Sequence, residues 1–116
     1  MTIENSALLL QGVLFLSLAY YYLKKPPQKI NYLYGYRTRR SMANQEVWDF
    51  ANLQSGKAFW RVAIATATIG IILLLFDISF KVLIQVGVLL IGLGISVWYV
   101  EKEIDNFFDK NGNKKG

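Results

Sequence analysis

The stretch FWRVAIATATIGIILLLF, residues 59–76, decides how this chain can fold, because its only charge is Arg61, near its start. As an α-helix this stretch rises about 27 Å, close to the ~30 Å thickness of the hydrocarbon core of a bilayer. The stretch therefore predicts a transmembrane helix.

Two further apolar runs have the same character. Residues 6–23 and 82–100 contain 18 and 19 residues, and neither run contains a charged side chain. A buried helix of a soluble protein can imitate one such run, but not three of them within 116 residues. We therefore predict an all-α membrane protein with three transmembrane helices. Residues 1–116 are expected to form a single membrane domain, since the chain has the length of one domain.

Cysteine and histidine are both absent from the sequence. Disulfides, thiol nucleophiles, catalytic triads and zinc sites built on these residues are therefore excluded. The carboxylates, apart from Asp77 at the end of a run, fall in loops and tails, where no histidine or cysteine assists them. The sequence predicts a protein that is not an enzyme and that has no cofactor and no metal.

Most of the positive charge lies in the segment from Lys24 to Arg61. The basic residues there are Lys24, Lys25, Lys29, Arg37, Arg39, Arg40, Lys57 and Arg61, opposed only by Glu46 and Asp49. Lysine and arginine in short loops tend to stay in the cytoplasm. This asymmetry predicts an external N-terminus, a cytoplasmic segment 24–58, an external turn near residues 77–81 and a cytoplasmic tail 101–116.

Aromatic rings are expected at the inner boundary of the membrane, where amphipathic rings prefer to lie. The rings concerned are Tyr20, Tyr21, Tyr22, Trp60, Trp98 and Tyr99. The basic segment beside them attracts anionic lipid headgroups, by about 1 kcal/mol per basic residue. A nucleic-acid surface is basic too, but the positive-inside rule already accounts for this pattern. The expected partners are membrane lipids, with no direct contact to nucleic acid.

The polar segment before the second run carries a helical pattern. Pro26 and Pro27 end the first helix, because proline cannot continue one. Ser41 is a candidate N-cap, with Asn44 as the alternative. Two stripes follow at helical spacing, an apolar one of Val47, Ala51 and Ala58 and a polar-aromatic one of Gln45, Trp48, Asn52 and Ser55. We therefore predict a cytoplasmic amphipathic helix on the membrane surface between the first two spans, with a bend at Gly56.

Small and polar residues also occur inside the spans. Small residues recur four apart at Ala63 and Ala67, at Thr66 and Gly70, and at Gly92 and Ser96. This spacing lets helix backbones approach closely in lipid, and ordinary packing of three helices explains it. Gln11 and Gln85 are expected to face protein or water rather than lipid, which makes them weak candidates for a polar pore.

The segment NYLYGYRTRRSMANQEVWDFAN, residues 31–52, resembles the SdpI/YfhL family of bacterial membrane proteins. In that family an N-x-x-x-G-x-R-T-x-x-S/T core precedes a helix with W-x-x-A-N, and one span lies before the motif and two after it. The matching residues here are Asn31, Gly35, Arg37, Thr38, Ser41, Trp48, Ala51 and Asn52. The resemblance extends over most of the chain and implies a location in the bacterial cytoplasmic (inner) membrane.

The resemblance also implies a function. The best-known member of the family is an immunity protein against a peptide toxin, and it receives a signal by holding a transcriptional repressor at the membrane. This chain resembles only the module shared across the family, without the additional spans of that member. The resemblance therefore implies a non-enzymatic immunity or signalling protein whose partner is a peptide toxin or a regulatory protein. Two other roles stay open, an accessory subunit of a larger membrane complex and a channel or transporter formed by a homo-oligomer.

We expect the motif residues to have separate tasks. Thr38 and Ser41 cap the helix that follows them. Trp48 anchors this helix at the membrane interface. Asn52 and Arg37 form buried polar contacts, either with each other's backbone or with a ligand.

The arginines of the motif fit two different partners. Arg37, Arg39 and Arg40 each offer a planar fork of donors that matches a carboxylate or a phosphate. A headgroup or an acidic peptide end would suit them, and an internal pair with Glu46 or Asp49 would use the same chemistry. The spacing alone leaves both a binding site and a purely structural motif open.

Overall fold

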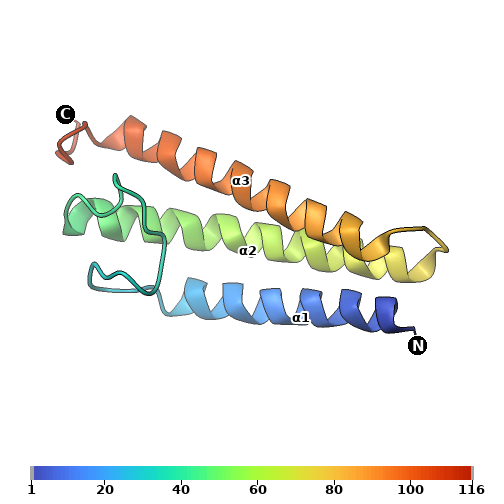
Figure 1. The fold of residues 1–116 in the computed structure, drawn as a ribbon. Coiled ribbons are helices and arrows are strands. Elements are labelled where there is room, and N and C mark those ends of the chain that lie inside the picture. The colour runs from blue at the N-terminus through green and yellow to red at the C-terminus, as the bar shows by residue number, and fades with distance from the viewer. Residues whose placement is uncertain (1, 116) are drawn as a thin grey trace.

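In the computed structural model, which describes residues 2–115, three long helices lie side by side, each antiparallel to the next (Figure 1). They are α1 (Ile3–Lys24), α2 (Gln45–Leu75) and α3 (Lys81–Phe107). α2 lies between the other two and packs against both, whereas α1 and α3 touch each other little. Each helix is long and apolar enough to cross a membrane, so the prediction of an all-α protein with three such helices is confirmed.

Local chemistry fixes where the first two helices begin and end. Thr2 caps α1, because its Oγ1 accepts a hydrogen bond from the Asn5 N–H at 3.0 Å. The helix stops just before Pro26, which lacks the N–H that a further turn would need. Asn44 caps α2 in the same way, with its Oδ1 accepting from the Val47 N–H at 3.0 Å. The N-cap of α2 is therefore the second of the two candidates that the sequence offered.

The prediction of a separate surface helix between the first two spans is wrong. Residues 45–58 form the first turns of α2, which continues without a break to Leu75. Apart from Gln45, which is exposed, the residues of both stripes are covered by protein. Val47 and Ala51 pack into a core with α3, and Trp48 and Asn52 are buried on the side of α1 and the loop. The amphipathic pattern reflects these two packed faces and leaves no apolar face for the membrane surface.

Gly56 does not bend the chain, contrary to the sequence-based expectation. The residue lies within the continuous helix α2 and is buried. A Cβ atom at this position would lie 3.6 Å from the Cα of Leu23. Gly56 therefore packs against α1 within an unbroken helix and does not form a hinge.

α2 and α3 are longer than a membrane requires. They contain 31 and 27 residues. These lengths correspond to rises of about 46 and 40 Å, compared with ~30 Å of hydrocarbon. Figure 1 shows both helices reaching past α1 at the end where the C-terminus and the loop between α1 and α2 lie. We call this end the head, and define it as residues 25–55 and 100–115.

The head holds the hydrophobic core of the protein. The buried members of this core are Tyr36, Val47, Ala51, Val100, Ile104 and Phe108. Along the spans, by contrast, large apolar side chains such as Leu10, Ile71 and Ile91 are exposed. Apolar side chains on the outside of a bundle are stable in lipid, where no hydrophobic force drives them inward. The head therefore packs like a small soluble domain on a bundle built for a membrane.

Inside the spans, Gln85 joins all three helices. Its buried Nε2 donates to the carbonyls of Leu8 at 3.1 Å and Thr66 at 3.2 Å. Gly70 leaves room for this amide, because a Cβ atom there would collide with it. Interhelical hydrogen bonds in lipid contribute only about 0.6 kcal/mol each on average. Gln85 therefore sets the register of the helices more than it stabilises them. The side chain of Gln11 is buried without a hydrogen-bond partner among residues 2–115.

Candidate functional site

The residues of the motif meet in the head, with Asn52 at the centre. The Asn52 Oδ1 accepts hydrogen bonds from the Tyr22 hydroxyl at 2.6 Å and from the Tyr36 N–H at 2.7 Å. The Asn52 Nδ2 donates to the carbonyl of Trp48, one turn earlier in α2, at 3.0 Å. This single buried amide therefore ties α1, the loop and α2 together, and the buried polar contacts expected of Asn52 are present.

Tyr22, near the end of α1, extends this network to Ser55 on α2. Its hydroxyl also forms a hydrogen bond with the Ser55 Oγ, and Ser55 in turn donates to the carbonyl of Asn52 at 3.3 Å. The Tyr22 ring packs on the rings of Tyr34 and Phe59, with centroids 5.8 Å away in both cases. A buried hydroxyl costs free energy unless it is hydrogen-bonded. The network meets this need with side chains from two helices.

Two residues of the motif shape the loop. The Asn31 Oδ1 accepts hydrogen bonds from the N–H groups of Leu33 and Tyr34 at 2.9 and 2.7 Å, which is an Asx turn. Gly35 has a φ of +106°, a conformation that L side chains rarely adopt. A Cβ atom at Gly35 would also lie 2.6 Å from the Asn52 Oδ1. Glycine is therefore needed here both for the turn and for the approach of the loop to Asn52.

The structure gives Trp48 a different role from the membrane anchor that we expected. Its side chain is 0% exposed. The indole N–H donates to the carbonyl of Pro27 at 2.9 Å. The indole thereby holds the start of the loop against α2. Ala51, the next matching residue, is also fully buried, where its small side chain joins the core.

Thr38 and Ser41 form a turn with each other instead of capping α2. The Thr38 N–H donates to the Ser41 Oγ at 2.8 Å, and the Ser41 N–H donates to the Thr38 Oγ1 at 3.2 Å. The Ser41 hydroxyl also lies 3.0 Å from the carbonyl of Tyr36. The expectation that these two residues cap the helix is therefore wrong, because each hydroxyl is used within the turn while Asn44 takes the cap.

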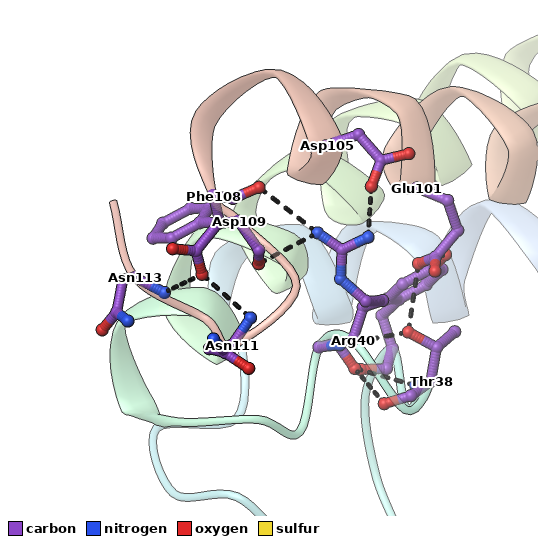
Figure 2. A network of polar contacts seen from close by, with 10 residues as sticks. Thr38, Arg40, Glu101, Asp105, Phe108, Asp109, Asn111 and Asn113 are labelled. Atoms are coloured by element: carbon purple, nitrogen blue, oxygen red, sulfur yellow. Dashed lines mark hydrogen bonds and ion pairs between the residues drawn. The ribbon is translucent and has the colours of Figure 1, made fainter. Parts of the chain in front are cut away.

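Glu101 reaches this turn from α3. Its Oε2 accepts hydrogen bonds from the Tyr36 hydroxyl at 2.6 Å and from the Thr38 hydroxyl at 3.0 Å, and Figure 2 shows the contact with Thr38. Burial raises the pKa of the Tyr36 hydroxyl well above its ordinary value of 10.0, and the hydrogen bond to Glu101 raises this pKa further. The Tyr36 hydroxyl therefore stays protonated and acts as a donor to Glu101 at neutral pH.

Arg40 clasps the end of α3, as Figure 2 shows. Its guanidinium forms an ion pair with Asp105 and donates to the carbonyls of Phe108 and Asp109, both at 3.3 Å. The ion pair alone is expected to contribute little, since Asp105 is largely exposed. The two carbonyls lie just past Phe107, the last residue of α3, so Arg40 holds the chain where it leaves the helix. The internal pair that we considered with Glu46 or Asp49 is thus replaced by a contact with α3.

The tail folds back over the start of α2. The Asp109 Oδ1 accepts hydrogen bonds from the N–H groups of Asn111 and Asn113, both at 2.9 Å (Figure 2). The Asn44 Nδ2 donates to the carbonyl of Gly112 at 2.8 Å. Asn44 therefore caps α2 with one side-chain atom and fixes the tail with the other.

Arg37 lies outside the buried network. Its side chain is exposed, and the guanidinium donates to the carbonyl of Tyr32 in the same loop. The expectation that Arg37 is buried against the backbone of Asn52 is therefore wrong, whereas the alternative of a ligand contact stays a prediction. Arg39 is exposed as well and makes no hydrogen bond to the rest of residues 2–115. Of the three arginines in residues 31–52, Arg37 and Arg39 are exposed to solvent and Arg40 is partly buried.

Three members of the network were not expected there from the sequence. Tyr36 and Glu101 were not singled out, and Tyr22 was expected only as a ring at the membrane boundary. Tyr22 had a usable signal, because it continues the helical stripe of Leu8, Gly12 and Ala19, which is buried in the structure. Tyr36 and Glu101 are 65 positions apart in the chain. Sequence spacing contains no information about such a contact, since it depends on how α3 packs.

Comparisons with known proteins agree on one family. The family model described as "SdpI/YfhL protein family" matches residues 28–100, which include the motif, all of α2 and most of α3. The "Uncharacterized protein YfhL" of Bacillus subtilis (strain 168) is 44% identical over 48 residues, which are 41% of this chain and 44% of that protein. The match thus spans less than half of the relative's own length. No solved structure matches the chain.

Proposed function

Because the chain belongs to the SdpI/YfhL protein family, we propose that it is a non-enzymatic protein of the bacterial cytoplasmic (inner) membrane that acts in immunity to a peptide toxin or in signal reception. The three apolar helices make it a multi-pass membrane protein. The immunity and signalling role is the one that the family resemblance implies. In this proposal the spans meet the membrane-borne signal, and the head binds a soluble partner.

The proposed orientation places the head in the cytoplasm. The loop carries Lys25, Lys29, Arg37, Arg39 and Arg40, whereas the turn between α2 and α3 carries one carboxylate and no basic residue before α3 begins. Basic residues in short loops favour the cytoplasmic side. The N-terminus and the α2–α3 turn lie at the opposite end of the bundle and would face outward.

One observation carries the proposal: most residues of the motif build the head, whereas Arg37 and its neighbour Arg39 stay exposed. Asn31, Gly35, Thr38, Ser41, Trp48, Ala51 and Asn52 are used to shape or bury the head. Arg37 and Arg39 remain exposed on the loop that these residues hold in place. A loop held by these hydrogen bonds presents two guanidinium groups, whose planar forks of donors match the carboxylates of an acidic partner.

The proposal predicts that a partner depends on these two arginines. The tagged chain is purified in mild detergent from the membranes of its own bacterium, and bound peptides and proteins are identified by mass spectrometry. We expect a peptide or a soluble regulatory protein with the wild type. With the double variant Arg37→Ala/Arg39→Ala, the amount of bound partner should fall about tenfold or more. Each hydrogen bond to a charged group contributes about 1.5–3 kcal/mol.

A matched control separates binding from folding. The variant Lys110→Ala/Lys114→Ala removes the same charge from the exposed tail and should retain the partner. Both double variants should unfold at the wild-type SDS concentration. Equal retention by both variants would contradict the role of the arginines. Recovery of large membrane subunits would instead favour an accessory subunit, and a homo-oligomer with lipid alone would favour a channel.

A further inference from the structure

An apolar groove runs along the membrane-spanning part of the bundle between α2 and α3. It has a volume of about 530 Å³ and is open along one side. Its walls include Ala58, Ala65, Ile91 and Ile95, and Arg61 supplies its one charged side chain. A groove of this size is within the range of sites that bind small molecules. In this case the groove faces the membrane, so its occupant must come from there.

Arg61 lies close to the level of the lipid headgroups. Two lysines lie over aromatic rings four residues earlier in the same helix. The Lys24 Nζ is 5.7 Å from the Tyr20 ring centroid, and the Lys102 Nζ is 4.8 Å from the Trp98 ring centroid. Rings that are apolar on one side and wet on the other prefer the membrane interface. Tyr20 packs on Trp60 with 5.8 Å between their centroids, and Arg61 follows Trp60 directly. Arg61 is therefore at interface depth.

The length of the groove matches one leaflet of a bilayer. On α3 the groove is lined from Val88 to Tyr99. These positions are about 16 Å apart along the helix axis, which is half of the ~30 Å hydrocarbon core. Trp98 and Tyr99 thus line the headgroup end of the groove, and Val88 lies near the midplane. Arg61 lies three residues deeper on α2 than Ala58, and a long side chain on a helix leans back toward the helix start, which here is the headgroup side. This arrangement of charge and apolar surface is complementary to a single anionic phospholipid.

We propose that the groove binds one anionic phospholipid, with an acyl chain between α2 and α3 and its phosphate paired with Arg61. Arg61 is exposed, and Lys57 lies one turn nearer the head on the same helix, where it adds positive charge. A helix from a second copy of this chain fits less well. The apolar runs 6–23, 59–76 and 82–100 contain no carboxylate to neutralise Arg61. An uncompensated charge in a helix interface costs several kcal/mol.

The test measures lipid binding to the full chain after delipidation in mild detergent. Native mass spectrometry follows titration with phosphatidylglycerol or with phosphatidylcholine of the same acyl chains. We expect one phosphatidylglycerol per chain, bound at least about tenfold more tightly than phosphatidylcholine. Arg61→Gln should remove most of this preference, and Ala65→Phe, which fills the groove, should weaken both lipids.

Two control variants make the result specific. Lys110→Gln removes a charge from the tail, and Ile64→Phe adds bulk on the exposed face of α2 away from the groove. Neither should change lipid binding. Equal affinity for both lipids in the wild type, or no loss with Arg61→Gln, would overturn the proposal. So would an Ala65→Phe variant that keeps its lipid but changes from a dimer to a monomer, because a helix would then occupy the groove.

Discussion

Replacement of Asn52 by alanine is expected to lower the free energy of unfolding by about 3 kcal/mol or more. The amide oxygen accepts from the Tyr22 hydroxyl and the Tyr36 N–H, and the amide nitrogen donates to the Trp48 carbonyl. Without this side chain, the Tyr36 N–H keeps only its longer contact with the Tyr22 hydroxyl, at 3.2 Å. A buried polar group left without a partner costs about 1–3 kcal/mol, and the cavity adds to this cost.

The measurement is SDS-induced unfolding in mixed micelles, followed by circular dichroism. Gln54→Ala is the matched control, because Gln54 carries the same kind of amide on the same helix and makes no side-chain hydrogen bond to the rest of residues 2–115. This control should change the free energy of unfolding by less than about 0.5 kcal/mol. If the Asn52 and Gln54 variants unfold alike, the central position of Asn52 in the head is refuted.

Gly35→Ala is expected to destabilise the head by about 3 kcal/mol, from two sources. The φ of +106° is strained for any L side chain. The new Cβ would also meet the Pro27 ring and the Asn52 Oδ1. The loop must therefore move away from α2, and the hydrogen bond from the Tyr36 N–H to Asn52 is lost with it.

Gly94→Ala provides the control for this second substitution. A Cβ atom at Gly94 would have no heavy atom within 4 Å, and the residue lies in the middle of α3. Alanine is favoured over glycine in a helix, so stability should stay unchanged or rise by up to about 1 kcal/mol. The double variant Gly35→Ala/Asn52→Ala should lose less than the sum of the single losses, because both break one network. Full additivity would argue against a shared network.

The three helices were predictable because their signal is local. Runs of 18 or 19 apolar residues report directly on spans, whatever the rest of the chain does. The extent of α2 was not predictable in this way. Its first turns carry polar residues such as Gln45 and Asp49, which resemble a surface helix until α1, α3 and the loop cover the two stripes.

The site was only partly predictable for a related reason. The motif and the stripe of Trp48, Asn52 and Ser55 were visible in the sequence, and all three residues are buried in one network. Which hydroxyl or amide caps a helix was not visible. Ser41 and Asn44 are both good caps, and the choice follows from contacts with Thr38 and with the tail. The positions of Arg37 and Arg40, one facing solvent and one clasping α3, likewise depend on tertiary packing.

The central claim, that the head lies in the cytoplasm, is tested most directly by measuring on which side of the membrane the head is found. Because the sequence contains no cysteine, Ser79→Cys, Arg39→Cys and Lys110→Cys each carry a single thiol at an exposed position. Intact cells are treated with a maleimide that does not cross membranes, before and after permeabilisation. We expect labelling of residue 79 in intact cells, and of residues 39 and 110 only after permeabilisation. Labelling of residue 39 or 110 in intact cells would place the head outside and contradict its proposed role as a cytoplasmic binding surface.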